Sequence, residues 1–206
     1  MKPNGVHVLF FLIMEHSESS ALLRRAREGS ATALNDLLTR NAGRLLAFIR
    51  LRLGHSLRAH LESHDILNAT LLNAFKRIDQ FEGRGDGRLM AWLAPIAMNE
   101  IRDQAAYHGR QRRDAARVVD VDDGLDGLAA ELHSQISCII LDEQTERLEQ
   151  AIEALRPEHR EVILLRKFEE LSFTEIGERL GKSPDACRML LARALTALTL
   201  EMRIAP

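Results

Sequence analysis

The stretch from Arg160 to Thr199 constrains the fold of this 206-residue chain more than any other part of it. Ser172 and Glu175 have the spacing of a capping box, in which a hydroxyl and a carboxylate satisfy free backbone N–H groups at a helix start. Gly181 is expected to end that helix, because glycine accepts a positive φ. Ser183 and Pro184 then predict the start of a second helix. A short capped helix, a glycine turn and a longer capped helix together predict a helix-turn-helix.

The second of these helices has two distinct faces. Apolar residues recur at helical spacing and are expected to face a core: Cys187, Leu191, Ala194 and Leu198. The residues on the opposite side are expected to be exposed: Arg188, Met189, Ala192, Arg193 and Thr196. An exposed, arginine-bearing second helix suits the major groove of DNA. The alternative is an ordinary pair of helices packed inside a bundle.

Composition favours helices in the rest of the chain as well. Aromatic residues make up 4% of the sequence, and no segment shows the sustained alternation typical of strands. Leu, Ala, Arg and Glu dominate, and all four are strong helix formers. We therefore predict an all-α protein, built as two small helical domains joined by an acidic linker.

The division into two domains follows from the distribution of charge, which the net charge of −2 conceals. Residues 17–117 contain 17 basic and 11 acidic residues, whereas residues 118–146 contain 8 acidic residues and no basic one. Residues 147–206 contain ten of each. This pattern predicts two modules on a negatively charged connector, the first of which suits a polyanion. The alternative for the basic block is a solvated helical surface.

Hydrophobic periodicity predicts four helices in the basic block, starting near residues 19, 30, 64 and 89. Gly29 is expected to separate the first two, and Pro95 is expected either to kink the last or to mark a new start. Four arginines are expected on the polar side of the second helix: Arg44, Arg50, Arg52 and Arg58.

Residues 1–17 are predicted to be an N-terminal extension, with Met14 as an alternative start. The apolar run 6–14 is too short to span a bilayer and lacks the cleavage site of a secretory signal. The competing interpretation is a short extra element on the core. The only cysteines, Cys138 and Cys187, form no CxxC pair, so neither a disulfide framework nor a zinc site is predicted. We expect a cytoplasmic protein without membrane insertion.

Patterns of enzymatic chemistry are weak in this sequence. His60 and His64 would share a helical face, with His55 close by, but a further metal ligand is missing. No nucleophile–base set and no phosphate-binding loop is present. We therefore expect no enzyme, no cofactor and no metal. A response regulator would need the strands of a receiver domain, and a purely protein-binding role would not need a helix-turn-helix.

Taken in order, these motifs resemble the extracytoplasmic-function sigma factors of bacterial RNA polymerase, over about residues 18–117 and 145–202. In the second part, residues 172–181 resemble the family pattern SxxEIAxxLG, and residues 193–198 resemble RAxxxL. In the first part, the similar segments are residues 65–75, 91–99 and 102–103.

This resemblance implies sigma region 2 over residues 18–117, an acidic linker over 118–144 and sigma region 4 over 145–206. It implies a sigma factor that binds the β and β′ subunits of core RNA polymerase and directs promoter recognition, DNA melting and initiation. Promoter DNA is the second implied partner, and an anti-sigma factor is a candidate third. The alternative is a helix-turn-helix regulator that binds duplex DNA without acting as a polymerase subunit.

The resemblance also implies three groups of contact residues. The expected −35 contacts are Ser172, Thr174, Ser183, Pro184, Asp185, Arg188, Met189, Ala192 and Arg193. The expected −10 contacts are Arg84, Arg88, Asn99, Arg102, Asp103, Arg110, Arg112 and Arg113. The expected polymerase contacts are Asp65, Asn68, Ala69, Leu72 and Asn73.

Overall fold

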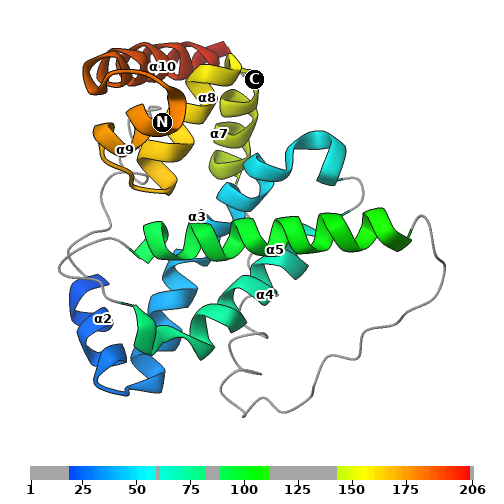
Figure 1. Ribbon diagram of the computed structural model, residues 1–206, viewed down its shortest axis with the longest axis vertical. Helices are drawn as coiled ribbons and strands as arrows, with labels where there is room; N and C mark the ends of the chain where they lie inside the picture. The colour runs from blue at the N-terminus through cyan, green and yellow to red at the C-terminus, as the bar shows by residue number, and fades with distance from the viewer. Residues whose placement is uncertain (1–18, 59–60, 82–88, 112–142, 205–206) are drawn as a thin grey trace.

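A computed structural model describes residues 19–58, 61–81, 89–111 and 143–204 (Figure 1). Within these ranges the chain is helical and contains no strand, as the sequence predicts. The first group of helices comprises α2 (Ser19–Arg27), α3 (Ala31–Arg58), α4 (Ser63–Lys76), the short η1 (Ile78–Gln80) and α5 (Leu89–Gln111). The second group comprises α7 (Glu143–Ala154), α8 (Pro157–Ile163), η2 (Leu164–Phe168), α9 (Phe173–Leu180) and α10 (Pro184–Ile204).

Several sequence predictions lie outside these ranges, namely those for the N-terminal extension, for the linker up to residue 142, and for Cys138. None of the described helices combines the length and the apolar character that a bilayer crossing requires.

Local sequence explains the boundaries in the first group. Gly29 has φ +91° and separates α2 from α3, and the Ser30 hydroxyl accepts a hydrogen bond from the Ala33 N–H at 3.3 Å. Gly54 interrupts the helical backbone with φ +61°, but α3 resumes and continues to Arg58. Pro95 lies inside α5, which is continuous, so no new helix starts there.

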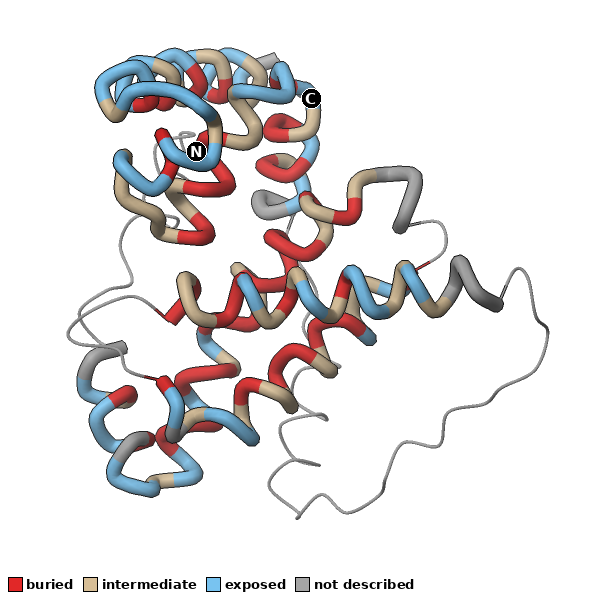
Figure 2. Tube along the Cα trace, viewed as in Figure 1, coloured by how far each residue is buried: buried red, intermediate tan, exposed pale blue. Residues whose placement is uncertain are grey.

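Helix α3 occupies the centre of the molecule (Figures 1 and 2). Figure 2 shows buried residues along much of its length, with α2, α4 and α5 packed around its lower part. Its largest fully buried side chains are Leu37, Leu38, Leu45, Leu46, Phe48 and Ile49. Burying a side chain of this size stabilises a fold by about 1.5–3 kcal/mol, so α3 is the main hydrophobic support of the first group.

Helix α3 also joins the two groups, because its upper part contacts α7 and η2. The rings of Phe48 on α3 and Phe168 on η2 stack with 6.0 Å between their centroids, and both are fully buried. In this structure the two helical groups are therefore in direct contact. The boundaries of the two domains stay a prediction.

Candidate nucleic-acid interface

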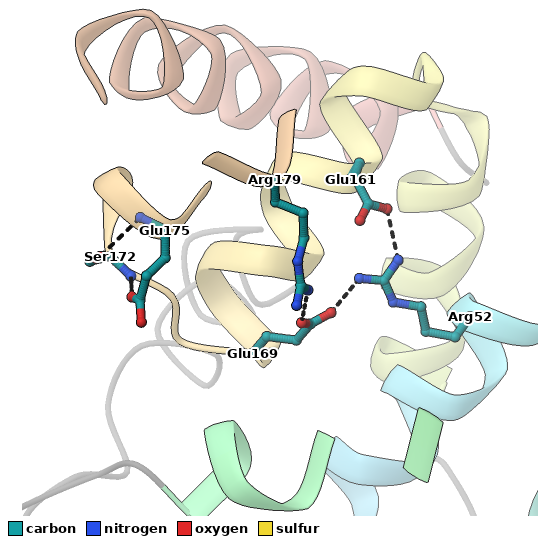
Figure 3. Close-up of polar contacts among 6 residues, drawn as sticks. All are labelled: Arg52, Glu161, Glu169, Ser172, Glu175 and Arg179. Carbon is teal, nitrogen blue, oxygen red and sulfur yellow. Dashed lines mark hydrogen bonds and ion pairs between the residues drawn. The ribbon is translucent and has the colours of Figure 1, made fainter. Parts of the chain in front are cut away.

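The turn between α9 and α10 has the geometry that its sequence predicts. The Ser172 hydroxyl accepts a hydrogen bond from the Glu175 N–H at 3.3 Å, and the Glu175 carboxylate accepts one from the Ser172 N–H at 2.7 Å (Figure 3). Gly181 ends α9 with φ +65°, and the Ser183 hydroxyl accepts from the Ala186 N–H at 3.2 Å at the start of α10. The capping box, the glycine turn and the serine cap are all confirmed.

Helix α9 approaches this turn very closely at Gly177, which was not among the residues singled out from the sequence. A Cβ atom added to Gly177 would lie 2.6 Å from the backbone carbonyl oxygen of Lys182. That distance is shorter than van der Waals contact allows, and the obstacle is backbone rather than a movable side chain. Gly177 therefore sets the packing of α9 against the turn that leads into α10.

Helix α10 presents one buried face and one exposed face. Its buried side chains are those the sequence predicts: Cys187, Leu191, Ala194 and Leu198. On the other side, the Arg188 side chain is 56% exposed and Met189 is 57% exposed. Of the other expected −35 contacts, Thr174, Ser183, Asp185, Ala192 and Arg193 are exposed, whereas Ser172 and Pro184 are half-buried.

Helix α5 carries the expected −10 contacts that the structure describes. Asn99, Arg102 and Asp103 are exposed, and Arg102 donates a hydrogen bond to the Asn99 side-chain oxygen at 2.8 Å. Arg110 also belongs to α5, but its side chain is not described. The remaining members of the set lie outside the described residues: Arg84, Arg88, Arg112 and Arg113.

Helix α4 carries the expected polymerase contacts. Asp65 is exposed in its first turn, whereas the other four are half-buried: Asn68, Ala69, Leu72 and Asn73. The Asn73 amide donates to the Glu100 carboxylate of α5 at 2.5 Å, so this residue also ties two helices together. Asp65 is therefore the most accessible member of the set.

No group of three potential metal ligands occurs among the residues that the structure places. His64 is half-buried on α4, whereas His60 lies outside the described ranges and the His55 side chain is not described.

An ion-pair network between the two helical groups was not predicted. Arg52, expected on the polar side of its helix, has a side chain that is only 14% exposed. Its guanidinium donates to the Glu161 carboxylate of α8 at 2.7 Å and to Glu169, which follows η2 (Figure 3). The other oxygen of Glu169 accepts from Arg179 of α9 at 2.6 Å. One carboxylate thus connects α3 with the first helix of the helix-turn-helix.

Two more arginines of α3 extend this network. The Arg50 guanidinium lies 2.8 Å from the carboxylate of Glu149 on α7. Arg44 lies 3.3 Å from the Glu170 carboxylate and also donates to the Lys167 carbonyl. The sequence predicts that these arginines lie on the polar side of the helix, but it does not reveal that Arg44, Arg50 and Arg52 each pair with a glutamate of the other group. The side chain of Arg58 is not described.

The backbone that receives these contacts is irregular. Residues 164–168 form a π-helical turn, in which the Glu169 N–H bonds to the Leu164 carbonyl at 3.0 Å. The Leu171 N–H reaches back to the Leu165 carbonyl at 3.0 Å, and Glu170 has φ +56°, which is uncommon outside glycine. Such π-turns are frequent at functional sites. Here the turn places Lys167, Phe168, Glu169 and Glu170 against α3.

Lys167 destabilises the contact between the π-helical turn and α3, because its charged ammonium group is partly buried close to two arginines. Burial lowers the pKa of its ammonium group below 10.5, and the charges of Arg166 and Arg44 lower it further. At pH values between that lowered pKa and 10.5, the Lys167 ammonium group is protonated more fully in the unfolded chain than in the folded protein. Lys167 therefore makes the free energy of unfolding rise with pH in this range. The penalty is fully present below the lowered pKa and vanishes above 10.5.

Replacing Lys167 with methionine should therefore stabilise the protein. At pH 7 we expect the Tm to rise by about 2–4 °C, and the gain to shrink as the pH approaches 10.5. Lys76→Met, at an exposed position near the end of α4, is the control and should give no gain. Thermal unfolding followed by circular dichroism tests this, and a lower Tm for Lys167→Met would contradict it.

The capped turn and the exposed arginine-bearing face of α10 define the C-terminal helices as a helix-turn-helix of the DNA-binding class. Residues 145–198 match the family model described as Sigma-70, region 4. The chain is 32% identical to the RNA polymerase sigma factor CarQ of Myxococcus xanthus over 176 aligned residues. The aligned residues make up 85% of this chain and 92% of CarQ. It therefore belongs to the sigma factors of RNA polymerase, in the extracytoplasmic-function group.

Two further comparisons extend over most of the chain. The ECF RNA polymerase sigma factor SigD of Mycobacterium tuberculosis is 25% identical over 195 residues, which are 93% of this chain and 87% of SigD. A co-crystal structure of the sigma factor RpoE with the anti-sigma factor NepR from Bartonella quintana has 21% identity and a TM-score of 0.43. That match covers 82% of this chain and 94% of the RpoE chain.

Proposed function

We propose that this sigma factor recognises the −35 element through α10, holds the opened −10 strand through α5 and binds core RNA polymerase through α4. The observation that carries the proposal is the exposed face of α10, which follows a capped turn and presents Arg188 and Arg193 to solvent. Recognition helices of this kind enter the major groove. An arginine that pairs with guanine through two hydrogen bonds contributes about 1–3 kcal/mol of discrimination.

The proposal for the −10 element rests on α5. Asn99, Arg102 and Asp103 are exposed on neighbouring turns and offer donors and acceptors for an unstacked base. Unstacking a base costs a few kcal/mol, so side chains that bind the extruded base stabilise the melted promoter. The basic residues that flank α5 in the sequence would add a salt-dependent attraction to the single strand.

The proposed domain organisation has region 2 at residues 18–117, a linker at 118–144 and region 4 at 145–206. The −35 and −10 elements lie roughly 25 base pairs, or about 85 Å, apart on B-form DNA. Since the two modules touch through α3 and η2 in this structure, we propose that they separate when the holoenzyme binds both promoter elements. In this role the chain acts as a cytoplasmic, non-catalytic polymerase subunit. An anti-sigma partner stays a prediction from the sequence.

Two single substitutions should separate the two binding activities. Arg188→Ala is expected to weaken −35-dependent promoter binding about tenfold, because it removes a base contact, and to leave polymerase affinity unchanged. Asp65→Ala is expected to weaken binding to core polymerase, because it removes the exposed charge of α4. Polymerase affinity is measured by fluorescence anisotropy, and promoter affinity by gel shift with saturating core. Equal loss of both affinities in a variant whose thermal unfolding matches that of the wild type would contradict the assignment.

The alternative function is a regulator that binds duplex DNA without polymerase. It predicts specific binding of the isolated chain to its target duplex and no new transcript when core polymerase is added. The sigma-factor proposal predicts the opposite: promoter-specific transcripts that appear only when both core polymerase and this chain are present.

A further inference from the structure

The guanidinium of Arg188 is held in place from two sides. Within α10 it forms an ion pair with Asp185, one turn earlier. From the neighbouring helix, the ring of Phe173 supports it: the Arg188 Cζ atom lies 5.2 Å from the ring centroid. Phe173 was not among the residues that the sequence assigned to the DNA interface.

The ring of Phe173 is itself held in place by its surroundings. It is the first residue of α9, directly after the Ser172 cap, and its half-buried side chain packs against the hydrophobic core. A second guanidinium contacts the same ring, because the Arg166 Cζ atom lies 5.0 Å from its centroid. Arg166 is itself oriented by a hydrogen bond of 2.8 Å to the Leu171 carbonyl. The ring is thus held by the core, by the start of α9 and by Arg166.

This arrangement suits an arginine that must contact DNA. A guanidinium that lies over a ring contacts it with its flat face, so the edge N–H groups that do not bond to Asp185 stay available for paired hydrogen bonds. Restricting its rotamers before binding lowers the entropy lost on association. The contact with Asp185 alone would be weak, because exposed ion pairs contribute little and are screened by salt.

We propose that Phe173 is a positioning residue for promoter recognition, and that its ring preorganises Arg188 for contact with duplex DNA. This inference rests on the proposed −35 function of α10. It assigns to α9 a part in specificity that does not require Phe173 to touch the DNA. It also assigns Arg166 the role of restraining the ring rather than reading bases.

The first test follows the arginine itself, without DNA. In the full-length protein, ¹⁵N relaxation of the Arg188 Nε–H reports how ordered the guanidinium is, and Arg188→Lys identifies its signal. We expect an ordered signal in the wild type and in Phe173→Tyr, which keeps a ring, and a mobile one in Phe173→Leu, which does not. If the Arg188 guanidinium is as ordered in Phe173→Leu as in the wild type, the proposal is overturned, regardless of the promoter affinity of the variant.

The second test measures specificity in the holoenzyme. Binding is compared between a promoter duplex mapped by start-site sequencing and the same duplex with a scrambled −35 element. Phe173→Leu should reduce the preference for the intact element roughly three- to tenfold, and Phe173→Tyr should restore it. In an Arg188→Ala background, Phe173→Leu should cause no further loss. An equal loss in both backgrounds would mean that the ring serves only packing, and would overturn the proposal.

Thermal unfolding of each variant controls for loss of structure, with Phe173→Met as a second apolar replacement if the leucine variant is unstable. The two tests also separate this inference from the function on which it rests. A wild-type holoenzyme with no preference for the intact −35 element would contradict the proposed function. A preference that is unaffected by Phe173→Leu would contradict only the role of Phe173.

Discussion

Gly177→Ala is expected to lower the Tm of the protein by about 5–10 °C, which corresponds to about 2–3 kcal/mol of lost stability. The added Cβ would lie 2.6 Å from the Lys182 carbonyl oxygen, so α9 and the turn before α10 must move apart. Because this turn sets the angle of α10, promoter binding should fall together with stability. Thermal unfolding by circular dichroism and promoter binding by gel shift measure the two effects.

Gly43→Ala is the matched control for this substitution. Gly43 also lies inside a helix, α3, but a Cβ built there meets no atom within 4 Å. Alanine is favoured over glycine in a helix by about 1 kcal/mol, so this variant should be more stable than the wild type. The same chemical change should therefore have opposite signs at the two positions. A Gly177→Ala protein as stable as the wild type would contradict the close approach of α9 to its turn.

Arg52→Glu is expected to separate the two helical groups. The substitution places a negative charge against Glu161 and Glu169, which now receive hydrogen bonds from Arg52. Removing one partner of a buried ion pair typically costs about 3–5 kcal/mol, and reversing its charge adds repulsion. Since 1.4 kcal/mol changes an equilibrium tenfold, the contact between α3 and η2 should be largely lost. Small-angle scattering should show a larger radius of gyration.

The control for Arg52→Glu is Arg179→Met. Arg179 also pairs with Glu169, but it lies on α9, within the same helical group as that carboxylate, and its side chain is 55% exposed. Its loss should leave the radius of gyration unchanged, because no contact with α3 is removed. An unchanged radius for Arg52→Glu would show that the ion pairs do not hold the groups together.

Local signals explain which parts of this fold could be predicted. The helix-turn-helix was predictable because caps, glycine turns and apolar periodicity each act within a few residues of one another. Ser172 and Glu175 are the clearest example, since their mutual hydrogen bonds depend on sequence spacing alone. The exposed side of α10 followed directly from the spacing of its buried side chains, so Arg188 and Met189 could be placed on the surface.

The contact between the helical groups could not be predicted, because it joins residues about a hundred or more positions apart. Arginines on the polar side of a helix give the same sequence pattern whether they face solvent or another group of helices. Only the tertiary structure brings Arg52 to Glu161. The π-turn at residues 164–168 escaped prediction for a related reason, since its apolar residues also fit an ordinary helical period.

Two further features left a signal that sequence reasoning could have used. Gly177 lies in the middle of a predicted helix, where glycine costs about 1 kcal/mol relative to alanine, and such a position often has a packing reason. Phe173 is a large aromatic residue directly after the Ser172 cap, a position where the start of a helix does not require an aromatic side chain. Gly177 is explained by its close approach to Lys182 in the turn, and Phe173 by its contact with Arg188 on α10.

Run-off transcription with purified core RNA polymerase tests the assignment of this chain most directly. Core polymerase alone, core plus this protein and core plus the Asp65→Ala variant are each incubated with a genomic promoter library, and transcript starts are sequenced. We predict a defined set of start sites that appears with the wild-type protein and is strongly reduced with Asp65→Ala. A transcript pattern identical to that of core polymerase alone would contradict the proposed role in initiation.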